Sequence, residues 1–146
     1  MRFSAVILLC SICLSVSSCS KVKKEDDADA FVGTYNISVI ENSVWGNDSG
    51  TINDKGTLII SKVSATKVRL YGFISTLGEV TGNNIYLEAE HNSDSAGYID
   101  VAYGPGTLSG NVLTFTSNMT GKLRSPSSGI LYPFRANSYF TAIKQY

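Results

Sequence analysis

The only histidine of the chain, His91, lies among residues that could perform acid–base or nucleophilic chemistry. It occurs in "EAEHNSDSAG", close to Glu90 and Asp94, with Ser93 and Ser95 nearby. A hydrolytic site needs a nucleophile, a base and an orienting acid that converge around a substrate. These residues all fall in one short predicted loop, so they are too close in sequence to converge easily. We therefore expect a solvated loop here, and we expect that the protein is not an enzyme.

Other oxygen-bearing side chains favour structural roles over metal binding. Glu88 and Glu90 share one face of a predicted strand, as a pair of catalytic carboxylates would. They alternate with Leu87 and Ala89, however, and are expected on the solvated face of that strand. The stretch "GNDSGTINDKG" contains Asn and Asp donors suited to calcium, but it lacks the ordered spacing and terminal Glu of a calcium loop. We expect turns there, and we expect neither a metal nor a cofactor.

Aromatic side chains flanked by polar residues give the clearest indication of a ligand site. Trp45 lies in the polar stretch "ENSVWGNDSG", and several rings crowd the last strand-like segment. Aromatic residues in such surroundings commonly line a pocket for a small apolar or sugar-like ligand. The candidate ligand-binding residues are Tyr35, Trp45, Tyr132, Phe134 and Phe140. The alternative is that these rings only fill the interior of a small barrel.

The first residues have the pattern of a secretory signal peptide. One positive charge at Arg2 precedes an apolar, uncharged run at residues 3–16. This run is shorter than the roughly 20 apolar residues of a membrane-spanning helix. It ends at Val16-Ser17-Ser18-Cys19, which resembles the bacterial lipobox. The resemblance implies that residues 1–18 are removed and that Cys19, carrying palmitate or a similar acyl chain, attaches the protein to a membrane.

The positions of the three cysteines favour an acylated Cys19. Cys10 and Cys13 lie in the segment that would be removed, so the mature chain could form no internal disulfide. A free exposed thiol is a liability in an oxidising compartment, whereas an acylated one is an anchor. The alternative is an ordinary secretory signal cut near Ser18, which would leave Cys19 as a free thiol.

Residues 19–30 are expected to form a flexible charged tether, since they are almost entirely polar. Their acidic residues resemble the export signal of surface lipoproteins in the Bacteroidetes, although lysines come first here. The resemblance implies a lipid-anchored outer-membrane protein, on the periplasmic side or the cell surface, with the surface favoured. Asp94-Ser95-Ala96 also resembles the acceptor sequence for O-linked sugars on exported proteins of that phylum, which implies glycosylation at Ser95.

The remaining residues, 31–146, have the length of one small domain. The chain carries 12 basic and 12 acidic residues with no basic run beyond the tether, so we expect no nucleic-acid partner. Apolar residues alternate with polar ones, as in antiparallel strands with one wet face. Strands are predicted at residues 31–40, 57–62, 67–73, 84–90, 97–103, 111–117 and 132–144.

Short connections are predicted between these strands. Residues tolerant of positive φ occur at 54–56, 82–84, 104–106 and 110–111. "GEVTGNNIYL" and "GTLSGNVLTF" echo each other and predict two similar hairpins. About eight sequential strands in a short all-β domain predict a single antiparallel up-and-down β-barrel, because closure removes exposed strand edges. A two-sheet β-sandwich is the alternative.

The start of the first strand, Gly33-Thr34-Tyr35, resembles the Gly-x-Trp signature of the lipocalins, with Tyr35 in place of the Trp. The domain as a whole resembles the small lipocalin-like (calycin-like) lipoproteins of gut Bacteroidetes. The family's arginine, which packs over that ring from the last strand, corresponds by position to Arg135. The resemblance implies a lipocalin-like barrel. Together with the aromatic residues, it leads us to expect binding of a small apolar or sugar-like ligand at the cell envelope. The alternative is a ligand-free structural or protein-interaction domain of an envelope complex, whose partners the sequence does not name.

The lipobox resemblance predicts acylation at Cys19. Cells grown with an alkyne-bearing fatty acid should incorporate label into the wild-type protein and lose that label in Cys19→Ala, because the thiol is the attachment point. In-gel detection after coupling of a fluorophore measures the difference. Equal labelling of the two proteins would show that Cys19 carries no lipid.

Overall fold

The computed structural model describes residues 26–146, so the predicted signal peptide and Cys19 lie outside the described residues. One short helix, α1 (Asp27–Phe31), precedes ten strands. The strands are β1 (Gly33–Trp45), β2 (Asp48–Lys62), β3 (Lys67–Gly72), β4 (Thr76–Thr81), β5 (Asn84–Leu87), β6 (Glu90–Asp94), β7 (Gly97–Tyr103), β8 (Gly106–Ser109), β9 (Val112–Arg124) and β10 (Leu131–Lys144). Within residues 26–146, no helix has both the length and the apolar character needed to cross a membrane.

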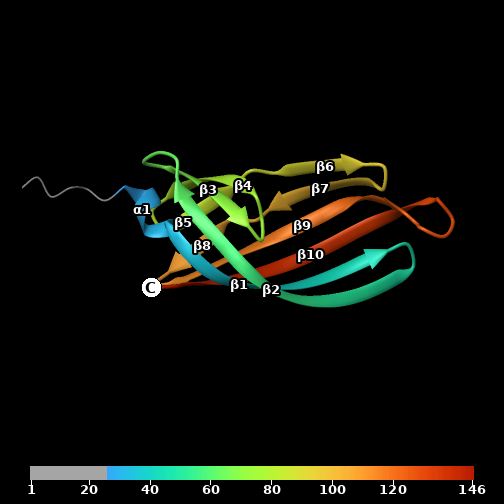
Figure 1. The fold of residues 1–146 in the computed structure, drawn as a ribbon, viewed down its shortest axis with the longest axis horizontal. Helices are drawn as coiled ribbons and strands as arrows, with labels where there is room; N and C mark the ends of the chain where they lie inside the picture. Colours follow the sequence, from blue (N-terminus) through green and yellow to red (C-terminus); the bar gives the residue numbers. More distant parts are fainter. Residues whose placement is uncertain (1–25) are drawn as a thin grey trace, which may run out of the picture.

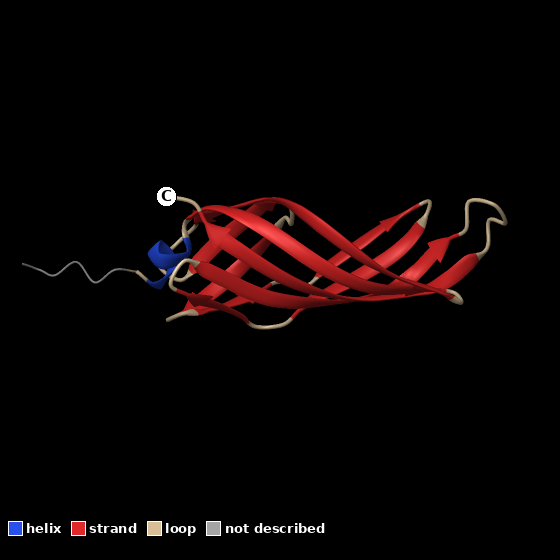
Figure 2. Ribbon diagram, turned by 90° about the horizontal axis from the view of Figure 1, so that it is seen from below, coloured by secondary structure: helices blue, strands red, loops and turns tan. Residues whose placement is uncertain are grey.

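All strands belong to one antiparallel sheet that closes on itself. Its order is β10-β1-β2-β3-β4-β5-β8-β9-β7-β6, and a further pairing of β9 with β10 makes a ring of eight strands. The strands run obliquely to the long axis of the molecule (Figure 2), as they do in closed barrels. The predicted all-β antiparallel barrel is therefore confirmed.

The strands of the ring differ greatly in length. β1, β2, β9 and β10 contain 13, 15, 13 and 14 residues, whereas β3, β4 and β5 contain 6, 6 and 4. β2 pairs with β3 only over residues 58–62, although its pairing with β1 continues to Asp48. The ring is consequently complete only at the end near α1. The β1–β2, β6–β7 and β9–β10 hairpins extend beyond it toward the other end (Figure 1).

The closed half of the barrel contains the hydrophobic core. Alternate residues of each strand point inward, and the largest fully buried side chains include Tyr35, Ile37, Leu58, Ile60 and Leu113. Inward-facing positions are odd-numbered on β1, β7 and β9 and even-numbered on β2 and β10, as their burial and register show. This alternation continues into the open half, where β2 still pairs with β1 but no longer with β3.

Helix α1 covers the closed end of the barrel. Its Ala28 and Phe31 are completely buried in the core, and the Ala28 N–H donates to the Ala65 carbonyl at 3.1 Å. The Lys62 Nζ forms ion pairs with Asp26 and Asp29, both at 2.7 Å. Residues 26–30, expected to belong to the flexible tether, thus form part of the folded domain. Composition misled here because these carboxylates bind specific groups of the barrel.

Glycine-asparagine pairs make three of the tight hairpin turns. Gly46, Gly82 and Gly110 have φ values of 61°, 56° and 60°, and each precedes an asparagine. Glycine at the first central position is the pattern of type II′ turns, whose twist matches that of the flanking strands. The two echoing segments are indeed hairpins, β4–β5 and β8–β9.

Two predicted turns have other roles. Residues 54–56 lie inside β2, because the β1–β2 pairing continues past them to the turn at Gly46. In residues 104–106, the first two residues separate β7 from β8, and Gly106 begins β8. Both strands run in the same direction and pair with β9. Pro105 has no N–H group to donate to a neighbouring strand, so pairing stops there without a reversal of the chain.

The position of α1 predicts that Phe31→Ala destabilises the domain. Truncation of a fully buried phenylalanine typically costs about 3–5 kcal/mol of unfolding free energy. Ile130→Ala is the matched control, because Ile130 is 56 % exposed and surface changes usually cost less than about 0.5 kcal/mol. Urea unfolding measures both. Equal stabilities of the two variants would show that α1 does not support the core.

Candidate functional site

Four aromatic rings form the boundary between the closed core and the open half. The rings of Phe115 on β9 and Phe140 on β10 stack with centroids 4.5 Å apart and an interplanar angle of 10°. Phe73, in the β3–β4 connection, meets Phe140 edge-on at 6.4 Å, and Tyr103 of β7 meets Phe115 at 6.3 Å. These contacts join segments that are distant in sequence. The four rings together form one layer, which we call the aromatic floor, at the top of the closed core.

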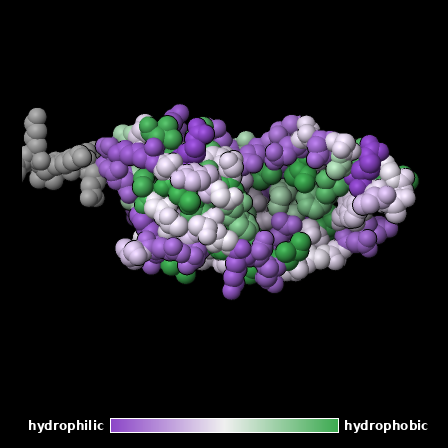
Figure 3. Space-filling view, in the orientation of Figure 1, coloured by the Kyte–Doolittle hydropathy of each residue, from purple (hydrophilic) through white to green (hydrophobic). Residues whose placement is uncertain are grey.

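A cavity of about 310 Å³ lies above this floor, and we call it the central cavity. It is open to solvent between β2 and the β6–β7 hairpin. Figure 3 shows hydrophobic side chains at the bottom of this hollow and hydrophilic ones along its edges. The lining residues are Val39, Glu41, Ile52, Asp54, Phe73, Ile74, Val101, Tyr103, Ser117, Met119 and Phe140.

Several polar groups accompany the apolar lining. Glu41 accepts a hydrogen bond from Ser138 Oγ at 3.3 Å, and Glu90 accepts one from the Tyr103 hydroxyl at 2.8 Å. Burial and the hydrogen bond to Glu90 raise the pKa of Tyr103 far above its ordinary value, so its hydroxyl stays protonated. Ser117 is 2 % exposed, and its side-chain hydroxyl forms no hydrogen bond with another residue of 26–146. The central cavity therefore offers an apolar surface with a few polar groups on its walls.

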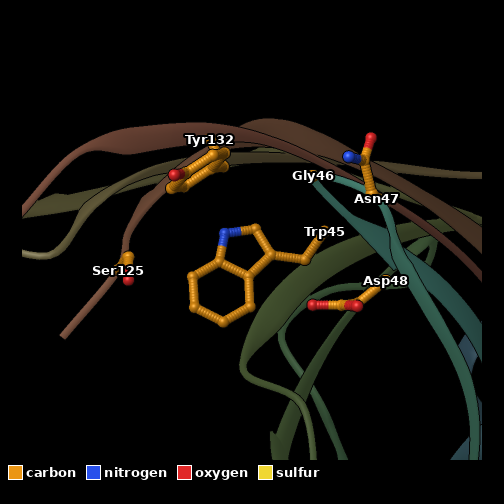
Figure 4. A pocket seen from close by; sticks show the side chains of 6 residues that line it. All are labelled: Trp45, Gly46, Asn47, Asp48, Ser125 and Tyr132. Carbon is orange, nitrogen blue, oxygen red and sulfur yellow. The ribbon is translucent and has the colours of Figure 1, made fainter. Parts of the chain in front are cut away.

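A second cavity of about 360 Å³, the tip cavity, lies at the far end of the β1–β2 hairpin. It is lined by Trp45, Gly46, Asn47, Asp48, Ser125 and Tyr132, and the rings of Trp45 and Tyr132 lie edge-to-face at 6.4 Å (Figure 4). The Trp45 Nε1 donates to the Leu123 carbonyl at 3.3 Å, which fixes the indole against β9.

The five predicted ligand-binding aromatics are divided between these places. Trp45 and Tyr132 line the tip cavity, and Phe140 lines the central cavity. Phe134 is the β10 partner of Trp45 in the register, is half-buried, and lines neither cavity. Tyr35 is fully buried in the closed core, away from both cavities. Three of the five rings therefore line a cavity, Tyr35 lies in the closed core, and Phe134 lies in neither place.

Tyr35 has a structural role at the closed end. Its hydroxyl donates to the Phe31 carbonyl at 2.7 Å, and burial, with the charge of Tyr146, raises its pKa to about 12. The cation over its ring is Lys144, with Nζ 6.0 Å from the centroid, and not Arg135 as the resemblance implied. Arg135 pairs with Val44 on the outer face, because it is an odd-numbered residue of β10. Gly33 leaves room for Lys144, whose Cε would lie 2.7 Å from an added Cβ.

The histidine segment is a strand and not the expected loop. Residues Glu90–Asp94 form β6, which pairs with β7. His91 Nδ1 lies 2.6 Å from Asp100 Oδ1, and its ring stacks on Tyr98, all on the exposed face of the hairpin. Neither Ser93 nor Ser95 contacts the imidazole in the way a nucleophile would contact its base.

Ser95 lies in the exposed turn between β6 and β7, where its carbonyl accepts from Arg124 Nε at 3.2 Å. This places its hydroxyl on the surface. Across residues 26–146, no group of three or more His, Cys, Asp or Glu side chains is arranged to hold a metal ion.

Sequence reasoning missed the carboxylates of the inner face. Glu90 was expected on the outer, solvated face of a strand that included residues 84–90. That strand ends before residues 88–89, which are not part of a strand, and Glu90 begins β6 with its carboxylate hydrogen-bonded to Tyr103 of β7. Asp54 was assigned to a turn and lies on the inner face of β2, beside Glu41 of β1. The sequence did contain a signal for these positions. The inward and outward alternation of strand residues, continued from Val39 to Glu41 and from Leu58 back to Asp54, places both carboxylates on the inner face.

Of the eight tyrosines of the chain, two are predicted to lose their hydroxyl proton only at unusually high pH. The pKa values of Tyr35 and Tyr103 are raised in the folded state, so the fold favours their neutral forms. For Tyr35, this contribution to stability should be complete below pH 10 and be lost as the pH rises from 10.0 to about 12. Phenolate absorbance measures the titration, and Tyr35→Phe and Tyr103→Phe should each remove one late step. Unchanged titration in both variants would contradict these environments.

No protein-family model matches the chain, and no curated protein matches it. Its function must therefore be inferred from the fold, the two cavities and the sequence motifs.

Proposed function

We propose that the protein captures a small ligand with an apolar body in the central cavity, while acylated Cys19 holds it at the cell envelope. The observation that carries this proposal is an open cavity of about 310 Å³, mainly apolar, above an intact aromatic floor. Its volume is at the lower end of the range for small-molecule sites, about 300–1,000 Å³.

Exposed apolar side chains inside the barrel support ligand binding. Ile52 faces the central cavity from β2 and yet remains 55 % exposed, because β3 does not extend beside this part of β2. Covering about 100 Å² of such surface would gain roughly 2.5 kcal/mol at 25 cal/mol per Å². A ligand with an apolar body would supply this cover.

The direction of the opening agrees with a lipid anchor at the N-terminus. Asp26, the first described residue, lies at the closed end of the barrel, opposite the hairpins that surround the cavity (Figure 1). Six residues separate it from Cys19 in the sequence, so an extended chain would keep the closed end within roughly 25 Å of the anchor. The central cavity would then open away from the membrane. We propose the outer membrane, with the surface favoured over the periplasmic side.

A protein-interaction domain is the second candidate. Its support is the outer face, where Ile40 of β1 and Tyr139 of β10 are register partners and are 50 % and 58 % exposed. Exposed apolar neighbours of this kind are common at protein contacts, although single exposed residues are ordinary on any surface. Under this alternative the central cavity would stay empty.

Filling the central cavity should abolish ligand binding. Val101 lines it from β7, so Val101→Trp would occupy the space, whereas Val44→Trp on the exposed outer face of β1 is the matched control. Calorimetry with an apolar probe such as decanol should show at least roughly tenfold weaker binding for Val101→Trp, or about 1.4 kcal/mol, and no change for Val44→Trp.

Native mass spectrometry of protein purified from its own envelope would test the same proposal without a chosen probe. A co-purified small molecule that is lost in Val101→Trp is the expected result. An unliganded monomer, together with equal decanol binding by both tryptophan variants, would favour the interaction domain.

A further inference from the structure

We propose that the ligand of the central cavity is an organic cation, an amine joined to an apolar body. This inference rests on the proposed function and adds the charge of the ligand to it. It is carried by three features: the sign of the charges on the inner face, a hydroxyl without a protein partner that reaches the cavity, and the apolar remainder of the lining.

The charged side chains of the inner face in the open half are acidic. Glu41 of β1, Asp54 of β2 and Glu90 of β6 occupy inner-face positions, and the first two line the central cavity. The basic residues of the same hairpins occupy alternate positions, on the outer face. They are Lys55, Lys122, Arg124 and Arg135. A cleft lined by one sign of charge attracts the opposite sign, although the whole chain is neutral.

Glu41 and Asp54 are placed to act on one ligand. In the β1–β2 register Val39 is opposite Asp54 and Glu41 is opposite Ile52, so the two carboxylates are diagonal neighbours on the same face. Neighbouring like charges on adjacent strands are unfavourable. Neither carboxylate forms an ion pair with another residue of the described chain. A cation between them would remove the repulsion.

Ser117 points independently to a hydrogen-bonding ligand. It lies on the inner face of β9, lines the central cavity and is 2 % exposed, and its side-chain hydroxyl forms no hydrogen bond within residues 26–146. No fully enclosed side-chain oxygen or nitrogen of these residues lacks a partner, so the Ser117 hydroxyl reaches the cavity, where a ligand can form a hydrogen bond with it. In the register Ser117 is opposite Ser138, and Ser138 is opposite Glu41, so the three form one row across β9, β10 and β1. An ammonium group along this row could donate to the hydroxyl and to the Glu41 carboxylate.

The apolar lining selects against a bare or hydrated ion. Val39, Ile74, Val101, Met119 and Phe140 make up much of the surface around the polar row. These side chains offer no oxygen ligands to a hard cation such as Ca²⁺ or Mg²⁺, whereas they can cover an alkyl or aromatic body. The site thus fits a molecule with one charged end and one apolar end.

Three probes with ten carbons each and different head-group charges distinguish the effect of ligand charge on affinity from the effect of apolar burial. Calorimetry of the purified protein at neutral pH would compare decylamine, decanol and decanoate, each below the concentration at which it forms micelles. We expect decylamine, which is protonated under these conditions, to bind at least roughly tenfold more tightly than decanol, and decanoate to bind most weakly.

Matched variants locate the effect. Glu41→Gln combined with Asp54→Asn should reduce decylamine affinity to that of decanol and leave decanol affinity unchanged, because both changes keep the shape and remove the charge. Glu79→Gln is the control, since Glu79 lies on the exposed outer face of β4. Ser117→Ala should weaken decylamine and decanol alike, because both can donate a hydrogen bond to this hydroxyl.

The outcomes distinguish this inference from the proposed function. Equal affinity of the wild-type protein for decylamine and decanol would overturn the cationic ligand and leave apolar capture standing. Failure of all three probes to bind the folded protein would overturn both. A preference for decylamine that survives in the Glu41→Gln, Asp54→Asn protein would overturn the assignment to this site.

Discussion

The unequal lengths of the strands determine how far the barrel closes, and so where the core ends and the open half begins. Hydrogen bonding can close a ring only as far along the axis as its shortest members reach, and β3, β4 and β5 are less than half as long as β1, β2, β9 and β10. In the closed half, inward side chains from all sides meet and exclude water. In the open half, the same long strands continue without β3, β4 and β5 beside them, so their inner face borders a cavity that is open to solvent. One sheet therefore provides both a hydrophobic core and an open cavity.

The two halves divide the physical tasks. Burial of Phe31, Tyr35, Leu58 and their neighbours stabilises the closed half, and α1 covers its end through ion pairs and backbone hydrogen bonds. The stacked rings of Phe115 and Phe140 end the core and form the floor of the cavity. Because stability resides mainly below this floor, the open half can retain features that weaken a fold, such as neighbouring carboxylates and an exposed Ile52.

The alternation of side chains along each strand separates basic from acidic residues between the two faces of the sheet. The chain has equal numbers of basic and acidic residues, which taken alone indicates no preference for a charged partner. Alternation places Lys55, Lys122 and Arg135 outside and Glu41 and Asp54 inside, so the cavity is acidic while the protein is neutral. The electrostatic field inside the cavity depends on this local arrangement and not on the net charge. A period of two residues is thus sufficient to create a charged site in a neutral protein.

The sequence by itself determined the all-β class, most strand positions, and the hairpin turns at Gly82 and Gly110, because alternation and turn chemistry are local properties. It also indicated that aromatic rings such as Trp45 and Phe140 lie at cavities. Only the tertiary structure decided that β2 continues through Asp54, that the break at residues 88–89 lets Glu90 contact Tyr103, and that α1 covers the barrel. These features depend on which segments become neighbours. Local polarity alone assigns a carboxylate such as Asp54 to a solvated turn or face. Only the strand register and the lining of the cavity show that it lies on the inner face.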